Sequence, residues 1–335
     1  MQISRHFFRY LCRMEKIKQL QEKFSSFMDS VAFDYRPAEL YAPITYTLFQ
    51  KGKRLRPMLC LLACDLFGGS LDEALYPALG LETFHNSTLL HDDIMDQAPL
   101  RRGMETVYKK WNTNMAILSG DAMIALAFDF VLRTPRSSET ARLLAQVHRE
   151  VCEGQQYDLN FETQPVVSIP EYMEMIRLKT AVLLATSLQM GAVVAGADEQ
   201  SQCALYDFGI AIGMAFQLQD DVLDCYGDES VFGKKTGGDI VENKKTYMLL
   251  KALELASPEM KETLTRWCST PTVEPVEKIQ AVIACYDALH VKAEAEQVIA
   301  DYHRQADALL DSVRIPEERK QPLRDYARML LGRSK

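Results

Sequence analysis

Apolar residues recur at spacings of three and four over most of the chain, the repeat of an α-helix with one buried face. The repeat is sustained over five long segments, and each of them predicts a helix: 71–95, 115–132, 138–161, 171–195 and 199–225. No strand-like alternation of similar length occurs, and the single β-leaning stretch, 166–169, is too short and too close to prolines to build a sheet. The sequence therefore predicts an all-α protein.

Local signals for helix starts agree with this prediction. Ser70 with Glu73, and Ser168 with Glu171, have the spacing of capping boxes, in which a serine side chain and a glutamate satisfy free backbone N–H groups. Ser257 followed by a proline is typical of an N-cap with proline at the first helical position.

Composition indicates one folded domain. The 335 residues are 47% hydrophobic, enough for a large core, and no low-complexity linker divides them. We therefore expect a single domain over 1–335, with 1–13 as a flexible N-terminal tail. No apolar run of about 18 residues lacks a charge, so no transmembrane segment is expected, and the N-terminus lacks the pattern of a signal peptide.

Charge and cysteine content narrow the function. A net charge of −8 argues against nucleic-acid binding, which needs a basic face. The eight cysteines form no CxxC pair, so their spacing supports neither a zinc site nor a redox motif. Reduced thiols in a cytoplasmic protein are the simplest interpretation.

Two copies of one acidic pentapeptide carry the strongest chemical signal. They are Asp92-Asp93-Ile94-Met95-Asp96 and Asp220-Asp221-Val222-Leu223-Asp224. Residues four apart stack on a helix, so each copy places like charges together, which opposes folding unless a cation is present. Mg²⁺ suits carboxylate ligands and is commonly held by one or two of them plus substrate phosphates. Each copy ends an apolar helical segment, so we expect the two to face each other across a cavity that holds a metal-bridged phosphate site.

Basic segments lie near both acidic motifs, and glycine and arginine in them suit close approach to phosphate. They are Gly52-Lys53-Arg54-Leu55-Arg56-Pro57, Arg101-Arg102-Gly103 and Gly233-Lys234-Lys235-Thr236-Gly237-Gly238-Asp239. Taken alone, the arginines after Asp96 could equally be ion-pair partners of the aspartates.

Together these motifs resemble the trans-isoprenyl diphosphate synthases, or polyprenyl synthetases, whose hallmark is a first and a second DDxxD motif. The resemblance covers roughly 40–250 in order and spacing, and the basic ending Arg333-Ser334-Lys335 looks like the family's C-terminal tail. It implies an isoprenoid-synthase-type helical bundle around a central cavity. It also implies a homodimer.

The resemblance implies metal ligands residue by residue. Three Mg²⁺ ions would be held by Asp92, Asp96 and Asp220. The remaining motif aspartates would bind through water or orient the ligands: Asp93, Asp221 and Asp224.

It also implies two diphosphate sites. The allylic diphosphate would be gripped by Arg101, Lys179 and Lys234, with Lys244 adding charge. Isopentenyl diphosphate would be bound by Lys53, Arg56, His85 and Arg102. The neutral oxygens of Thr180 and Gln217 would face the reacting cation, and with Lys179 they form the expected catalytic set.

The implied reaction is head-to-tail condensation. The allylic C–O bond ionises, isopentenyl diphosphate attacks the carbocation through its double bond, and a proton is lost to the departing diphosphate. Mg²⁺ and the lysines would stabilise the leaving group electrostatically.

Product length follows from the residues before the first motif. In the family, a bulky aromatic five residues before the first aspartate blocks the growing chain, and here this position is Ser87, followed by Thr88. At about 1.5 Å of rise per residue, the helix offers no plug about 7.5 Å from the metals. We therefore expect a product of C20 or longer, with Met123, Phe128 or Phe130 as candidate floors.

Other functions fit the motifs less well. A C15 farnesyl diphosphate synthase differs only in product length, whereas class I terpene cyclases build their second metal motif from Asn, Ser and Glu. An HD-type phosphohydrolase could use His85 and His91-Asp92, but it leaves the second motif unexplained. A non-catalytic partner subunit predicts damaged motifs, and none is damaged.

Overall fold

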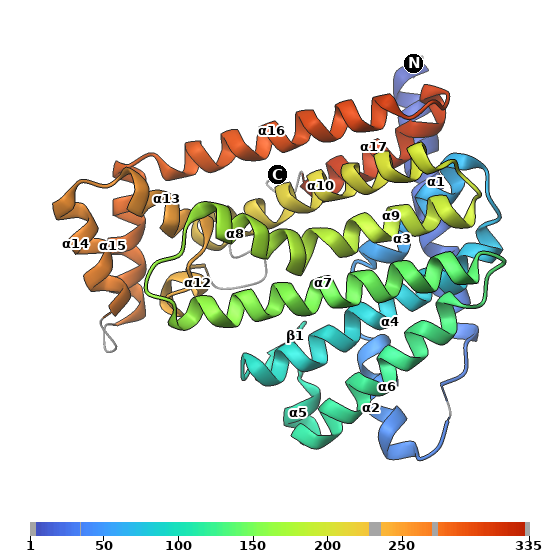
Figure 1. Cartoon of the computed structure of the whole chain (residues 1–335), viewed down its shortest axis with the longest axis horizontal. Helices are drawn as coiled ribbons and strands as arrows, with labels where there is room; N and C mark the ends of the chain where they lie inside the picture. The colour runs from blue at the N-terminus through green and yellow to red at the C-terminus, as the bar shows by residue number, and fades with distance from the viewer. Residues whose placement is uncertain (1–4, 34, 228–235, 270–273, 332–335) are drawn as a thin grey trace. The chain divides into compact units, whose positions relative to one another are not determined.

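A computed structural model describes residues 5–33, 35–227, 236–269 and 274–331. Helices make up nearly all of the described secondary structure, and one two-stranded antiparallel hairpin accompanies them (Figure 1). The elements of the N-terminal half are α1 (Arg5–Ser30), α2 (Ala38–Leu48), α3 (Leu55–Phe67), α4 (Leu71–Met95), β1 (Leu100–Arg101), β2 (Met104–Glu105), α5 (Val107–Lys110), α6 (Thr113–Val131) and α7 (Ser137–Thr163). The all-α prediction is confirmed.

The C-terminal half continues the helical pattern. Its elements are α8 (Ile169–Ile176), the π-helical segment η1 (Arg177–Ala181), α9 (Val182–Val194), α10 (Glu199–Tyr226), α12 (Gly238–Val241), α13 (Tyr247–Leu255), α14 (Pro258–Ser269), α15 (Pro275–Ala288), α16 (Val291–Ser312) and α17 (Glu317–Leu331).

Most of the predicted boundaries agree with the observed ones. Helix α4 has the predicted bounds, and Ser70 Oγ accepts a hydrogen bond from Glu73 N at its start. At the start of α8, Ser168 and Glu171 form the complete capping box. The predicted helix 171–195 is interrupted by η1, and the short hairpin, whose turn holds Arg102 and Gly103 at positive φ, was not predicted.

The described chain divides into two compact units. The first unit is Met1–Val147 with Thr186–Tyr206 and Val313–Tyr326, and the second is His148–Ala185 with Asp207–Ser312 and Ala327–Lys335. A compact unit is not by itself a separately folding domain, so the single domain over 1–335 stays a prediction. Helix α1 begins at Arg5, inside the segment 1–13 that we expect to be a flexible tail, and its flexibility also stays a prediction.

The core of the first unit is built around α4 and α6, which lie side by side (Figure 1). A Cβ added at Gly80 would lie 2.6 Å from Val131 Cγ1, and one added at Gly120 would lie 2.3 Å from His91 Nε2. The first half of α4 therefore meets the end of α6, so the two helices run antiparallel, and their backbones come close at Gly80. Glycine is required at Gly80, because an added Cβ would also lie 2.9 Å from the backbone oxygen of Ala127, whereas the close atoms at Gly120 belong to the His91 side chain.

The core of the second unit contains an equally close helix contact. A Cβ at Gly209 would lie 2.3 Å from Ala185 Cα, and a Cβ at Gly213 would lie 2.6 Å from Ala181 Cα. The two glycines, four residues apart on α10, therefore pack against η1 and α9 and allow a close helix approach. This contact fixes α10, which carries the second acidic motif, against the segment that carries Lys179.

Among the described residues, one helix, α6, is long and apolar enough to cross a membrane by length and composition alone, with 39% of the relevant window buried. Asp121 and Asp129 lie within it, and its exposed apolar residues include Ile117 and Leu118. The predicted absence of a transmembrane segment therefore stays a prediction.

Candidate active site

The end of α4 presents the first acidic motif. Asp96 is the C-cap, and its backbone N–H donates to Asp92 O at 2.8 Å, so these two residues lie one helical turn apart. Asp92 is partly exposed and Asp96 is exposed, whereas Asp93 between them is only 4% exposed. The motif thus separates two solvent-accessible carboxylates from one that is turned inward.

Asp93 is held by an arginine of the hairpin. Arg101 Nε donates to Asp93 Oδ1 at 2.6 Å. Burial raises the pKa of Asp93, and the Arg101 charge and hydrogen bond oppose that increase. Since Asp93 is already engaged, its predicted role in orienting the site has a structural basis, and Arg101 is fixed beside the motif by the same bond.

A concentrated group of cationic residues surrounds His85 on α4. The charges of Arg54, Arg56, Arg101 and Arg102 all lower the pKa of His85 after burial, which is the largest cause, and the pKa lies well below 6.5. At neutral pH the imidazole is therefore uncharged, and it can offer a hydrogen bond without adding to the positive charge. The structure thus brings together His85, Arg56, Arg101 and Arg102, four of the residues that the sequence predicted to bind diphosphates.

Arg56 is unusually poorly solvated for an arginine. Burial lowers its pKa to about 10, although the Glu82 carboxylate opposes the shift. Its buried Nε has no hydrogen-bond partner among the described residues. A poorly solvated guanidinium with an unused Nε donor is stabilised when an anion binds, which suits a phosphate site. Lys53, three residues earlier, is exposed.

In the second motif the middle aspartate is again the buried one. Asp221 is 3% exposed and accepts hydrogen bonds from the Tyr172 hydroxyl, from Gln217 Nε2 at 3.3 Å and from Tyr247 N at 3.3 Å. Burial raises the pKa of Asp221 to about 7, and the Tyr172 hydrogen bond opposes that increase. Asp220 and Asp224 are partly exposed, and Asp224 Oδ2 accepts from Asp239 N at 3.1 Å.

The π-helical segment places the predicted catalytic residues beside α10. Thr180 Oγ1 donates to Gln217 Oε1 at 2.9 Å, and Lys179 Nζ pairs with Asp158 Oδ2 at 2.5 Å. A Cβ at Gly154 of α7 would lie 2.4 Å from Lys179 N, so glycine lets α7 approach this segment. Single-turn π-helical insertions occur frequently at functional sites.

Lys244 and Lys234 are the two further lysines that the sequence predicted near the allylic diphosphate. Lys244 Nζ lies 3.0 Å from Glu242 Oε2 and 3.8 Å from Asp239 Oδ1, so it pairs with carboxylates of α12 and its C-cap. Lys234, predicted to bind the allylic diphosphate, lies outside the described residues, as do Gly233 and Lys235 of its motif and the basic ending 333–335.

Both predicted chain-length residues lie inside the first unit. Ser87 is fully buried and its hydroxyl donates to Phe84 O at 2.7 Å, while Thr88 Oγ1 donates to His85 O at 2.8 Å. The antiparallel register of α4 and α6 brings Met123, which is also fully buried, to the level of these two residues. No aromatic side chain is contributed by α4 itself at either position.

Sequence reasoning missed several residues of this site. Asp158, Tyr172 and Glu82 engage site residues directly, but each lies 21 or more residues from the partner that it contacts. The one usable signal was Gly154 in the middle of a helical segment, four residues before Asp158, because such a glycine marks close packing.

Within the described ranges, no group of three or more His, Cys, Asp or Glu side chains is already arranged to hold a metal. Mg²⁺ does not need such a group, because it usually keeps several waters and takes one or two carboxylates plus substrate phosphates. The exposed pair Asp92 and Asp96 fits that kind of site, and it does not fit the all-protein ligand set of a phosphohydrolase.

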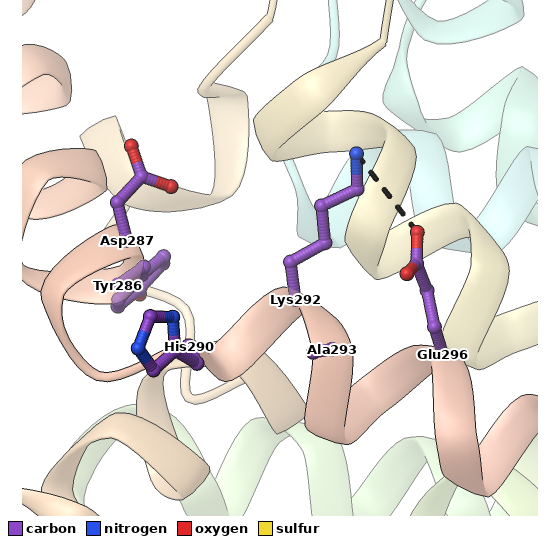
Figure 2. A pocket seen from close by; sticks show the side chains of 6 residues that line it. All are labelled: Tyr286, Asp287, His290, Lys292, Ala293 and Glu296. Atoms are coloured by element: carbon purple, nitrogen blue, oxygen red, sulfur yellow. Dashed lines mark ion pairs between the residues drawn. The ribbon is translucent and has the colours of Figure 1, made fainter.

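A surface cavity of about 250 Å³ lies elsewhere, between α15 and α16 (Figure 2). Its lining includes two carboxylates and one lysine: Asp287 accepts from the Tyr226 hydroxyl at 2.8 Å, and Lys292 lies 3.9 Å from Glu296. None of the predicted site residues lines it, and its charge does not suit diphosphate binding.

The helical fold and the paired acidic and cationic residues define an enzyme of the isoprenoid synthase class. A structure described as geranylgeranyl pyrophosphate synthase matches with a TM-score of 0.91 and 41% identity, covering 95% of this chain and 99% of that one. The chain belongs to the polyprenyl synthetase family, whose model matches residues 37–286. Both the predicted fold class and the predicted enzyme class, a trans-prenyltransferase, are confirmed.

Two further relatives describe what such proteins bind and make. The geranylgeranyl diphosphate synthase of Methanosarcina mazei is 38% identical over 72% of this chain and 76% of its own length. A geranylgeranyl pyrophosphate synthase of Corynebacterium glutamicum, whose structure is complexed with isoprenyl diphosphate and magnesium, matches with a TM-score of 0.80 and 28% identity, covering 97% of this chain and 98% of that one.

Proposed function

We propose that this enzyme condenses isopentenyl diphosphate head-to-tail with an allylic diphosphate and releases a trans-polyprenyl diphosphate of C20 or longer. The observation that carries the proposal is the group of Arg56, Arg101 and Arg102 around the neutral His85. His85 lies on α4, the helix whose C-terminal end carries Asp92 and Asp96. Few ligands need clustered arginines and solvent-accessible carboxylates together. A diphosphate that is bound partly by arginine and partly through a divalent cation needs both.

Isopentenyl diphosphate is assigned to the arginine-rich side of α4. Arg56 and Arg102 supply planar donor forks, His85 supplies a neutral donor, and Lys53 supplies an exposed ammonium. This substrate keeps its diphosphate during the reaction, so its site needs tight, fixed cations rather than a device for expelling a leaving group.

The allylic diphosphate is assigned to Arg101 together with Lys179, Lys234 and Lys244. The Asp158 carboxylate that pairs with Lys179 limits the unbalanced charge until substrate arrives. The metal ligands on this account are Asp92, Asp96 and Asp220, and we propose three Mg²⁺ ions. When bound, Mg²⁺ supplies Lewis acidity that stabilises charge on the diphosphate oxygens.

In the proposed reaction, Thr180 and Gln217 act on the allylic substrate as it ionises. The allylic C–O bond breaks, the isopentenyl double bond forms the new C–C bond, and a proton leaves to the released diphosphate. Thr180 and Gln217 share a hydrogen bond in which Gln217 Oε1 is the acceptor, so their oxygens are held in place. Neutral oxygens can stabilise the allylic cation by their dipoles without trapping it covalently.

The proposed product length is supported by Ser87 and Thr88. Neither can block a prenyl chain growing along α4, so the first barrier is expected on α6, where Met123 lies at the same level and Phe130 lies about two turns further on. The name of the Methanosarcina mazei relative, a C20 synthase, supports the same length, and a C15 product is less favoured.

We further propose a homodimer that packs through α6. The exposed residues Ile117 and Leu118 give this helix an apolar outer face, and Asp121 and Asp129 argue against lipid as its partner. A cytoplasmic location is proposed from the cysteines, since Cys60, Cys64, Cys152, Cys203, Cys225, Cys268 and Cys285 are free thiols.

One assay tests the reaction. The purified enzyme is incubated with labelled isopentenyl diphosphate, Mg²⁺ and, separately, the C5, C10 and C15 allylic diphosphates, and the extracted products are sized. We expect label in a product of C20 or longer. No incorporation with any of the three starters would contradict the proposed function, and a product that stops at C15 would contradict the proposed length alone.

A further inference from the structure

The turn that leads into α3 contains an unusual backbone conformation. Arg54, the N-cap of α3, has φ 49° and ψ 44°, in the left-handed region that residues with side chains rarely adopt. It lies directly after Lys53 and two residues before Arg56. The conformation at Arg54 therefore sets the relative directions of two residues that we assign to isopentenyl diphosphate.

The Arg54 side chain is anchored at three points. Its Nη1 donates to Glu82 Oε1 at 2.7 Å, and its Nη2 donates to Leu48 O at 2.5 Å and to Gln50 O at 2.8 Å. Leu48 is the last residue of α2, and Glu82 lies in the middle of α4. One guanidinium thus joins the end of α2, the loop 49–53 and α4.

Glu82 is a buried carboxylate, and burying a carboxylate is costly unless it is paired with a cation. It is 2% exposed, and its Oε1 also accepts from Asn86 Nδ2 at 3.1 Å. Its charge acts on Arg56 and Arg102 as well as on Arg54. A negative charge so close to an anion site opposes anion binding by Coulomb's law. The presence of Glu82 is explained if it fixes the positions of the neighbouring arginines.

We propose that Glu82 and Arg54 are positioning residues, a buried ion pair that holds the turn 49–54 so that Lys53 and Arg56 meet the diphosphate of isopentenyl diphosphate together. The inference rests on the proposed function of that pocket. Neither residue touches substrate on this account, and the pair acts through the backbone of the turn.

The direction in which Glu82→Gln changes the affinity for isopentenyl diphosphate distinguishes a positioning role from a purely electrostatic one. Glu82→Gln keeps the shape of the side chain but removes its charge. If Glu82 acted only as a nearby charge, its removal would strengthen diphosphate binding. If it positions the turn, binding weakens. We expect the dissociation constant for isopentenyl diphosphate, measured by calorimetry without the allylic substrate, to rise about tenfold.

A second variant keeps the test decisive if Glu82→Gln does not fold. Arg54→Lys retains the positive charge but cannot reach a carboxylate and two carbonyl oxygens at once. It should weaken isopentenyl diphosphate binding by a similar factor, and the double variant should be little worse than either single one, since both changes break the same pair.

Steady-state kinetics supply the control. Both variants should raise KM for isopentenyl diphosphate while leaving KM for the allylic diphosphate within about twofold. Asp65→Asn, which breaks the Lys16–Asp65 pair (2.8 Å) in the same unit, should change neither KM. Unchanged or tighter isopentenyl diphosphate binding, or equal losses for both substrates, would overturn the inference. A wild-type enzyme that fails to use isopentenyl diphosphate would instead overturn the proposed function beneath it.

Discussion

The hydroxyl of Tyr172 on α8 donates a hydrogen bond to the buried carboxylate of Asp221 on α10. The first motif has a matching feature, because its buried middle aspartate, Asp93, is held by Arg101. In both motifs one carboxylate is used to fix the helix end, and the flanking aspartates remain partly or fully exposed. The acidic triplets are therefore divided between an anchor and candidate ligands.

This division predicts different results for the two kinds of residue. Tyr172→Phe removes one donor from a buried carboxylate and should lower the free energy of unfolding by about 1–3 kcal/mol. Activity at saturating substrate should fall less than in Asp220→Asn. Urea unfolding and initial rates measure both effects. The matched control Tyr157→Phe changes an exposed tyrosine and should alter neither. If Tyr172→Phe abolished activity without loss of stability, the anchor role would be wrong.

The lowered pKa of His85 predicts a pH dependence of stability. The folded protein disfavours the charged imidazole, so His85 contributes stability above its ordinary pKa near 6.5, and this contribution is lost as the pH falls below that value. The free energy of unfolding should decrease between pH 7 and 5 by at most about 1.4 kcal/mol per pH unit for this one proton.

Comparing the wild type with His85→Gln isolates that contribution. Glutamine stays neutral at every pH, so the variant should show a shallower decrease over the same interval. The measurement is denaturant unfolding in metal-free buffer at a series of pH values. Identical slopes for the two proteins would show that His85 protonates as easily in the folded chain as in the unfolded one.

Product length should respond to bulk at Ser87. Ser87→Phe places an aromatic ring five residues before Asp92, on the helix along which the prenyl chain is expected to grow. The product should therefore shift from C20 or longer towards C15. Product sizing from labelled isopentenyl diphosphate reads this directly. Overpacking a buried site can cost about 1–3 kcal/mol, so the melting temperature is checked in parallel.

The control for this change is Ala288→Phe, which adds the same ring at an exposed position of α15. It should leave product length unchanged. A Ser87→Phe enzyme that folds and still makes the wild-type product would contradict the proposed path along α4.

Replacing Lys179 should weaken the use of the allylic diphosphate and leave the binding of isopentenyl diphosphate almost unchanged. Lys179→Met removes an ammonium whose charge-assisted bonds to a diphosphate are worth roughly 1.5–3 kcal/mol, equivalent to a ten- to hundredfold loss in kcat/KM for the allylic substrate. KM for isopentenyl diphosphate should change little. Arg177→Met, which removes a neighbouring cation paired with Glu174, is the matched control. Equal effects on both substrates would place Lys179 outside the allylic site.

The sequence predicted helices well where one period ran without interruption. Helix α4 was predicted residue for residue because its serine cap, apolar face and acidic end are all local signals. The π-helical segment was not predicted, since its extra residue leaves the spacing of apolar positions almost unchanged over a few turns. The hairpin was missed because two-residue strands are too short to show alternation.

The candidate site also contains residues that the sequence predicted and residues that it did not. Residues within motifs were predicted from their spacing, whereas their anchors were not, because Arg54 with Glu82 and Tyr172 with Asp221 are 28 and 49 residues apart. A buried carboxylate on an apolar helix such as Glu82 has no spacing that identifies its partner. Only the folded chain shows which cation neutralises it.

The central claim is that the exposed motif aspartates bind diphosphate through divalent cations. Calorimetric binding of a bisphosphonate, a stable diphosphate analogue, to the wild type and to Asp92→Asn tests it most directly. We expect tight binding with Mg²⁺, binding at least tenfold weaker with EDTA, and a similar loss in Asp92→Asn even when Mg²⁺ is present. Equal affinity with Mg²⁺ and with EDTA would contradict the account.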